Sequence, residues 1–269
     1  MTLSVCARRE NVILDDAAVR GIEKGLADFD ELVRWLPCAK RWIPQISDEE
    51  IVRMPEVLRR MTLSVRRLGD PAFTPMAAVA GAFADIIREE ICAVSPADYV
   101  IVNNGGDISF NADGELRVGI VSDIGRREIT HRLVLPTGGI HGIATSGFGG
   151  RSLSRGIASA VTVIAETCAL ADACATDIAN HTCADAAEII FCPANEIDYD
   201  SDLQDLSVVR EVGKLDERTV HAALENGFAR AKQLCEAGTA KGAVLFVKNS
   251  FTFYPNDLMI AEIPKQAME

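Results

Sequence analysis

A strand-like run that leads directly into an alanine-rich helix is the feature that most constrains the fold of this chain. The run "AVTVIAET" begins at Ala160, and "CALADACATDIANHTCAD" continues it to Asp185. The first segment is apolar and rich in β-branched residues, which is typical of a buried strand, whereas the alanines of the second favour a helix. A strand and a helix that are both this apolar need further layers on either side. The segment therefore predicts a mixed chain of strands and helices with a substantial core.

The remainder of the chain also alternates strand-like and helix-like segments, and no domain boundary is evident in its sequence. Of its 269 residues, 48% are hydrophobic and 25% are charged, which suits a folded chain with a large core. No repeat of fixed period and no low-complexity linker interrupts it. We therefore predict one α+β domain over residues 1–269, with antiparallel sheets packed against helices.

Several local patterns predict individual elements. We expect an amphipathic helix from about Asp15 to Leu36, a capping box at Ser47 and Glu50, and a charged helix from about Glu217 to Glu236. The predicted strands are "ENVILD", "DYVIVNN", "LRVGIV" after a "NADGE" hairpin turn, and a closing pair, "GAVLFVKN" and "SFTFYP".

Composition excludes some classes of function. A formal net charge of −12 argues against a nucleic-acid partner or an anionic membrane, because binding phosphates requires clustered Lys and Arg. The longest apolar runs are too short to span a bilayer, and no signal peptide is evident, so we expect a cytoplasmic protein. Its eight cysteines form no CxxC pair and are expected to be reduced. The oligomeric state stays open, although acidic domains of this size often form homodimers.

Asp172 and Thr176 stand four residues apart in the alanine-rich helix and therefore share one face. Their hard oxygen atoms could hold Mg²⁺ or Ca²⁺. Alternatively, Asp172 caps the start of its helix and Thr176 bonds back to a carbonyl one turn earlier. The spacing alone favours this second, structural interpretation.

Two glycine-rich segments could bind phosphate. "NNGGDIS" and "GIATSGFGGRSLSRG" offer open backbone amides, hydroxyl donors and two arginines, Arg151 and Arg155. Neither segment matches a P-loop or a dinucleotide fingerprint, and hairpin turns would explain the glycines equally well.

The order of these segments resembles the ApbE superfamily, the FAD:protein FMN transferases. The resemblance runs from Pro75 to His181 and rests on "AGAFAD", "VNNGGDI", "GIATSG" and "AVTVIAETCALADACATDIAN". It implies an ApbE-like, T-fold-like domain that binds a flavin nucleotide, such as FAD or another nucleotide, or a similar phosphorylated or heteroaromatic ligand.

The resemblance also implies roles for particular residues. Mg²⁺ would bind Asp172, Thr176 and a backbone carbonyl near Val79, beside the pyrophosphate of FAD. The residues that would line the flavin pocket are Asn104, Gly105, Gly106, Asp107, Thr145, Ser146 and Gly147. Asp85 matches an aspartate that follows the lysine-glycine pair of the family.

Two departures from the family pattern bear on activity. Ala80 stands where transferases carry a lysine, and "FGGRSLSRGIAS" replaces a histidine-containing segment that resembles "HIIDPRTG". His141 lies on the wrong side of the "TSG" motif to replace that histidine. The pattern is that of an uncharacterised cytosolic ApbE-like branch.

These departures leave three functions open. The first is Mg²⁺-dependent transfer of FMN from FAD, with Asp107 or His141 as a guessed general base. The second is a non-catalytic flavin-binding or metabolite-binding protein. The third is different chemistry on a small cyclic substrate, with an anion site made by Arg151 and Arg155.

Overall fold

The computed structural model describes residues 2–126 and 128–263, and it confirms the α+β class with antiparallel sheets packed against helices. The chain divides into two compact units. Unit 1 comprises Met1–Gly114, Thr137–Ala144 and Ile164–Cys174, and unit 2 comprises Glu115–Pro136, Thr145–Val163 and Ala175–Glu269. Three elements have residues in both units, namely β7 (Gly142–Ser146), β8 (Ala160–Ala165) and α6 (Cys168–His181). The single domain stays a prediction.

Unit 1 contains most of the N-terminal half of the chain. Its own elements are β1 (Leu3–Arg9), β2 (Val12–Ile13), α1 (Asp15–Arg34), α2 (Leu36–Ala39), η1 (Ile43–Gln45), α3 (Asp48–Arg53), α4 (Glu56–Arg66), η2 (Pro75–Ala78), α5 (Val79–Val94), β3 (Tyr99–Asn104) and β4 (Asp107–Asn111). The strands follow the order β2-β1-β3-β4-β7, and the pairs β1 and β2, β1 and β3, β3 and β4, and β4 and β7 are antiparallel.

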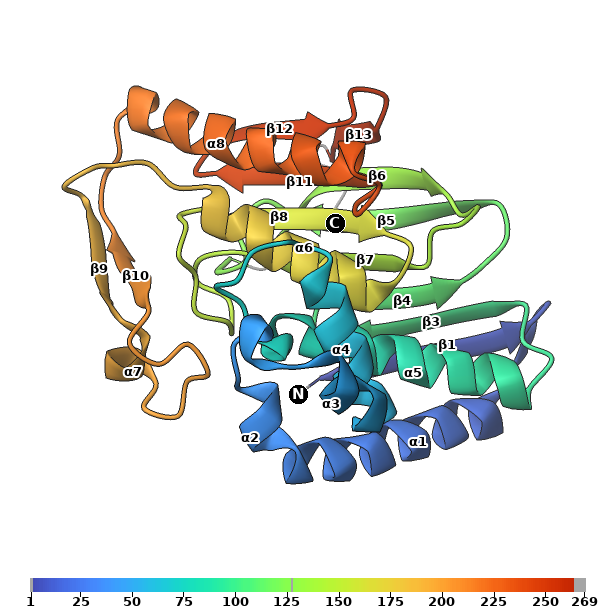
Figure 1. Cartoon of the computed structure of the whole chain (residues 1–269). Coiled ribbons are helices and arrows are strands. Elements are labelled where there is room, and N and C mark those ends of the chain that lie inside the picture. The colour runs from blue at the N-terminus through green and yellow to red at the C-terminus, as the bar shows by residue number, and fades with distance from the viewer. Residues whose placement is uncertain (1, 127, 264–269) are drawn as a thin grey trace. The chain divides into compact units, whose positions relative to one another are not determined.

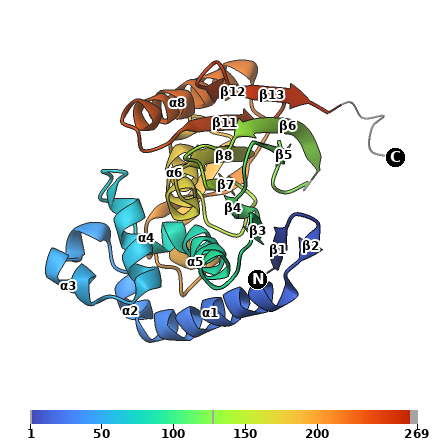
Figure 2. The ribbon, with the colours of Figure 1, turned by 90° about the vertical axis from the view of Figure 1, so that its right-hand side faces the viewer.

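Helix α5 forms the centre of unit 1. It packs against β3 and β4, and α1 lies along it (Figures 1 and 2). The close approach of α1 depends on Gly21, because a Cβ atom there would lie 2.6 Å from Cγ1 of Ile91. The core between these elements includes Ile87, Ile91 and Val102.

The double glycine forms the turn between β3 and β4. Asn104 pairs with Asp107, so Gly105 and Gly106 make up a two-residue hairpin loop with φ angles of +69° and +119°. Such a loop strongly favours glycine, because other residues rarely adopt these angles. The amide of Gly106 donates to Oδ1 of Asn103 at 2.9 Å, so this amide is not open to a ligand.

Unit 2 contains three groups of strands. Its own elements are β5 (Glu115–Val121), β6 (Ile129–Pro136), β9 (Ile189–Pro193), α7 (Ala194–Ile197), β10 (Ser207–Val212), α8 (Glu217–Glu236), β11 (Gly242–Val247), β12 (Ser250–Tyr254) and β13 (Met259–Glu262). The strand orders are β8-β11-β12, β13-β6-β5 and β9-β10. Every residue of β11 is buried, and α8 packs against β11 and β12.

Most of the predicted elements are confirmed, and two are wrong. Helices α1 and α8, the capping box at Ser47 and the closing hairpin β11–β12 lie where expected. The first long strand is β1 (Leu3–Arg9), whereas only Val12–Ile13 of "ENVILD" is extended. The "NADGE" segment is not a hairpin turn, because β5 pairs with β6.

Candidate functional site

The start of α6 is capped by a side chain from a distant part of unit 1. Asp85 on α5 is buried, and its carboxylate accepts hydrogen bonds from the amides of Cys168 (3.1 Å) and Ala169 (2.9 Å). The Ser109 hydroxyl on β4 donates to the same carboxylate at 2.6 Å. Burial raises the pKa of Asp85, and these three hydrogen bonds oppose the rise. Asp85 therefore satisfies amides that α6 itself leaves unpaired.

Asp172 makes the reciprocal contact. Its Oδ2 accepts a hydrogen bond of 3.0 Å from the amide of Gly81, in the first turn of α5. Amides in a first helical turn lack partners within their own helix. The alternative in which Asp172 caps its own helix is therefore wrong, because Asp172 caps α5 while Asp85 caps α6.

Two glycines allow the backbones to come this close. A Cβ atom on Gly81 would lie 2.3 Å from the carbonyl oxygen of Cys168, and one on Gly142 would lie 2.2 Å from the Cys168 nitrogen. Neither position can accept a side chain without moving the backbone. The first turn of α5 and the start of β7 therefore both lie directly against the start of α6.

The charges of three carboxylates raise the pKa of one buried thiol, that of Cys168. The pKa of Cys168 is raised well above its ordinary value, first by complete burial and then by the charges of Asp85, Asp107 and Asp172. Asp107 itself is 7% exposed. The structure therefore brings two predicted site residues, Asp107 and Asp172, to the start of α6 together with Asp85.

Asn104 reaches the peptide group that Asp172 binds. Its Nδ2 donates to the carbonyl of Ala80 at 3.0 Å, and the amide on the other side of that peptide bond belongs to Gly81. The Asn104 side chain is buried, and its Oδ1 has no hydrogen-bond partner among the described residues. Val79 is the first residue of α5 and therefore lies next to this peptide group.

His141 is held by β4. Its Nδ1 lies 3.1 Å from the carbonyl oxygen of Phe110, and the Phe110 amide donates to the carbonyl of His141 at 2.9 Å. A carbonyl can only accept, so Nδ1 carries the proton in the neutral ring and Nε2 is left as an acceptor.

Helix α6 is buried around most of its surface. Between Cys168 and Asn180, the three partly exposed residues are Asp172, Thr176 and Asn180. Residues four apart lie above one another on a helix, so these side chains form one narrow polar row. Asp172 and Thr176 therefore share the accessible face of the helix.

The glycine- and arginine-rich segment of unit 2 is anchored at the end of this row. The amide of Arg155 donates to Oδ1 of Asn180 at 2.8 Å, and Gly156 lies where a Cβ atom would be 1.9 Å from the carbonyl oxygen of Ala179. Arg151 is exposed and Arg155 is partly exposed. Earlier in unit 2, the Thr145 hydroxyl lies 2.9 Å from that of Thr162.

The other carboxylate on α6, that of Asp177, is fully buried and pairs with a basic group through one of its oxygens. Asp177 has no solvent exposure, and its Oδ2 accepts from Nε (2.9 Å) and Nη2 (2.6 Å) of Arg230 on α8. His181 Nδ1 lies 2.9 Å from both the Oδ1 and the backbone oxygen of Asp177, and the backbone oxygen has the better hydrogen-bonding geometry. The hydrogen bond to Asp177 raises the pKa of His181.

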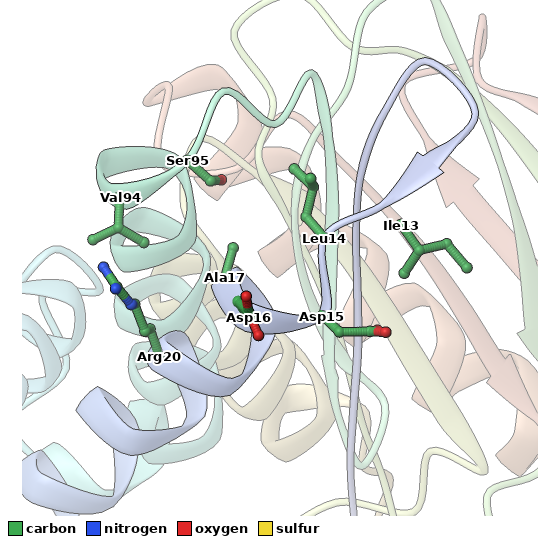
Figure 3. Close-up of a pocket in the computed structure, with 8 residues that line it drawn as sticks. All are labelled: Ile13, Leu14, Asp15, Asp16, Ala17, Arg20, Val94 and Ser95. Atoms are coloured by element: carbon green, nitrogen blue, oxygen red, sulfur yellow. The ribbon is translucent and has the colours of Figure 1, made fainter.

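A hollow of about 500 Å³ lies elsewhere in unit 1, at the start of α1 (Figure 3). It is lined by Ile13, Leu14, Asp15, Asp16, Ala17, Arg20, Val94 and Ser95. None of these described residues was predicted to bind a ligand.

The sequence alone missed the contacts that organise the site. Asp85 was noted only through the family pattern, and neither Ser109 nor Asn180 was singled out. One signal was available, because Asp85 is a single carboxylate inside the apolar run "AGAFADII". A buried carboxylate in such a run needs hydrogen-bond donors from elsewhere in the fold.

In the described part of the chain, no helix is both long enough and apolar enough to cross a membrane.

Several proteins resemble the chain in sequence. A UPF0280 protein of Methanopyrus kandleri is 40% identical over 159 residues, which are 58% of this chain and 62% of that protein. One of Methanothrix thermoacetophila is 38% identical over 52% of this chain and 58% of its own length. The chain thus spans less than two thirds of the length of these curated relatives.

Two solved structures resemble the chain less closely than these relatives do. The apo flavinyl transferase ApbE of Pseudomonas stutzeri has 15% sequence identity and a TM-score of 0.36, over 66% of this chain and 46% of that one. The flavin transferase ApbE of Vibrio cholerae has 15% identity and a TM-score of 0.35, over 67% and 49%. These values are too low for a residue-by-residue comparison.

The family comparison covers far more of the chain. A family model described as AbpE bacteria matches residues 3–253. The resemblance drawn from the sequence is confirmed, and the chain belongs to this ApbE-like family.

Proposed function

We propose that the chain binds a flavin nucleotide, or a similar phosphorylated heteroaromatic ligand, together with Mg²⁺. The observation that carries the proposal is the polar row on α6, where Asp172 and Thr176 are accessible on a helix otherwise buried from Cys168 to Ala179. A carboxylate accepts several bonds at once, so the hydrogen bond from Gly81 is compatible with a metal at Asp172.

The side chains present suit a hard divalent cation. Asp172 offers a carboxylate and Thr176 a hydroxyl one turn later, and Mg²⁺ prefers oxygen ligands. Asp85 and Asp107 add negative charge near the start of α6. Val79 is the proposed backbone ligand, at the start of α5. When bound, Mg²⁺ would neutralise phosphate charge and make the phosphorus more electrophilic.

Asn104 supports a heteroaromatic ligand. Its buried Oδ1 has no partner among the described residues, and leaving such an acceptor unpaired costs about 1–3 kcal/mol. We propose that a ring N–H, such as that of an isoalloxazine, satisfies this oxygen when the bound ligand displaces the groups that bury it. Gly105, Gly106 and Asp107 follow Asn104 in the hairpin and are proposed to contact the same ligand.

In unit 2, we propose Thr145, Ser146, Gly147, Arg151 and Arg155 as residues that bind anionic groups. The backbone of Arg155 is fixed by Asn180, one helical turn after Thr176. A guanidinium held in this way can bind phosphate oxygens through two parallel hydrogen bonds.

If the chain transfers FMN, an acceptor hydroxyl oxygen would form a bond to the FMN phosphorus while the bond to the AMP leaving group breaks. A base must then take the hydroxyl proton. Asp107 and His141 are the proposed candidates, and Nε2 of His141 is the nitrogen left as an acceptor.

A second candidate is binding without catalysis. Ala80, which stands in place of the family lysine, offers no charge beside the Asp172 contact. A third candidate is different chemistry on a small cyclic substrate, for which Arg151 and Arg155 would form the anion site.

One experiment separates these functions. The protein is incubated with FAD and Mg²⁺, AMP release is followed, and flavin retained after desalting is measured. AMP release that is lost in Asp172→Asn but kept in Asp113→Asn, an exposed control, supports transfer. Retained flavin without AMP supports binding alone. Neither AMP nor retained flavin would reject both flavin functions.

A further inference from the structure

Helix α1 carries its large apolar side chains on the outside of unit 1. Four of them are about half exposed or more, namely Val19 (52%), Leu26 (62%), Phe29 (48%) and Val33 (52%), and Ile22 between them is partly exposed. Their spacing of three, four, three and four residues places them in one stripe along the helix. We call these five residues the outer stripe.

Apart from Phe29, whose ring centroid lies 6.1 Å from that of Phe83 on α5, the outer stripe is not the face by which α1 packs on its own unit. The buried face consists of Ala17, Gly21, Gly25, Asp28 and Leu32. Gly21 and Gly25 lie against Ile87 and Ile91 of α5, where a Cβ atom would come within 2.8 Å of a side-chain carbon. The buried face is therefore made mainly of small residues, with Leu32 its one large apolar side chain, whereas the outer stripe is made of large ones. A continuous exposed apolar stripe of this kind marks an interaction surface more often than scattered exposed residues do.

A row of carboxylates follows one edge of the outer stripe. Asp16, Glu23 and Asp30 are exposed, are seven residues apart, and each stands three residues before an apolar member of the stripe. In the described part of the chain none of these three has a salt-bridge partner. In coiled coils, charges at such flanking positions select the partner and its orientation.

This charge pattern distinguishes between two partners that could cover the outer stripe, a second copy of the chain and a helix of another protein. A second copy of the chain would bring the same acidic row and a net charge of −12, so the two copies would repel one another. A helix with an apolar stripe of the same spacing, flanked by Lys or Arg, would cover the apolar side chains and pair with the carboxylates. We propose that α1 is the docking surface for a basic amphipathic helix of a partner protein.

Two synthetic peptides of three heptads test the proposal. Both carry Leu at positions a and d, and the flanking positions are Lys in one peptide and Glu in the other. Binding to the full chain is measured by fluorescence anisotropy. We expect the Lys peptide to bind about tenfold tighter or more, and the preference to weaken as salt is raised.

Variants of the chain locate the contact. Leu26→Ala with Val33→Ala should weaken the Lys peptide about tenfold or more, because two large contacts are lost. Glu23→Lys with Asp30→Lys should reverse the preference toward the Glu peptide. Circular dichroism checks that these exposed substitutions leave the fold intact.

Three results would overturn the proposal. One is equal affinity for both peptides, and another is a preference that survives the charge reversal. The third is a dimer of the chain in sedimentation that Leu26→Lys abolishes, because it would assign the outer stripe to a second copy.

Discussion

Asp85 and Asp172 cap each other's helices: Asp85 of α5 accepts from the first amides of α6, and Asp172 of α6 accepts from the amide of Gly81 in α5. The exchange joins two segments that lie more than 80 residues apart in the sequence. It also places a partly exposed carboxylate at a junction that a buried carboxylate already stabilises. Structural and ligand-binding roles can therefore be tested separately.

Replacing Asp85 should destabilise the fold. Asp85→Ala leaves the amides of Cys168 and Ala169 without their acceptor, and a buried unsatisfied donor costs about 1–3 kcal/mol. We expect the free energy of unfolding in urea to fall by about 2–4 kcal/mol, since two donors are affected. Asp113→Ala, on an exposed loop, should change it little. An unchanged value for Asp85→Ala would contradict the capping role.

Gly81 should not tolerate a side chain. The Cβ atom of Gly81→Ala would meet the Cys168 carbonyl oxygen at 2.3 Å, so the backbone must shift. Overpacking of this kind typically costs about 1–3 kcal/mol. The matched control is Gly138→Ala, where a Cβ atom meets nothing within 4 Å. Thermal denaturation should lower the melting temperature of the first variant clearly more than that of the second.

Local patterns in the sequence predicted the elements whose causes are local. The capping box at Ser47, the helix from Glu217 to Glu236 and the final hairpin follow from periodicity and capping within a few residues. Strand β1 (Leu3–Arg9) was missed because its partners in β3 lie 91 positions away at Arg8↔Tyr99 and 101 positions away at Leu3↔Asn104.

The candidate site, too, depends on contacts between distant residues that local sequence patterns do not reveal. The spacing of Asp172 and Thr176 identified the accessible face of α6, but the cap from Asp85 and the approach of Gly81 are tertiary contacts. Helix α1 was predicted from its periodicity. Which of its faces is buried depends on the fit of Gly21 and Gly25 against α5, and periodicity does not report that fit.

The stability of unit 2 should depend on pH through His181. Its pKa is raised by Asp177, so the protonated ring is favoured in the folded state. This stabilisation is fully present below the ordinary histidine pKa of about 6.5 and is lost as pH rises through the raised value. His181→Gln should remove this part of the pH dependence in urea denaturation, whereas His221→Gln, at an exposed position of α8, should retain it. Identical pH profiles for His181→Gln and the unmodified chain would rule out this contribution.

Thr176→Val should weaken cation binding with little effect on stability. The change replaces a partly exposed hydroxyl by a methyl group of the same shape, so packing is retained. We expect Mn²⁺ affinity, followed by electron paramagnetic resonance, to fall about tenfold, which corresponds to about 1.4 kcal/mol. Thr219→Val on α8 is the matched control. A cation affinity that is the same in both variants would remove Thr176 from the metal site.

Calorimetric titration of Mg²⁺, with and without FAD, into the unmodified chain and Asp172→Asn tests whether Asp172 holds a metal beside a flavin nucleotide. Asparagine keeps an oxygen that accepts from Gly81 but removes the charge that would hold the metal. We expect Mg²⁺ to bind the unmodified chain, and its binding to weaken at least about tenfold in Asp172→Asn while the melting temperature changes little. Equal Mg²⁺ binding by both proteins, or none by the unmodified chain, would contradict this expectation.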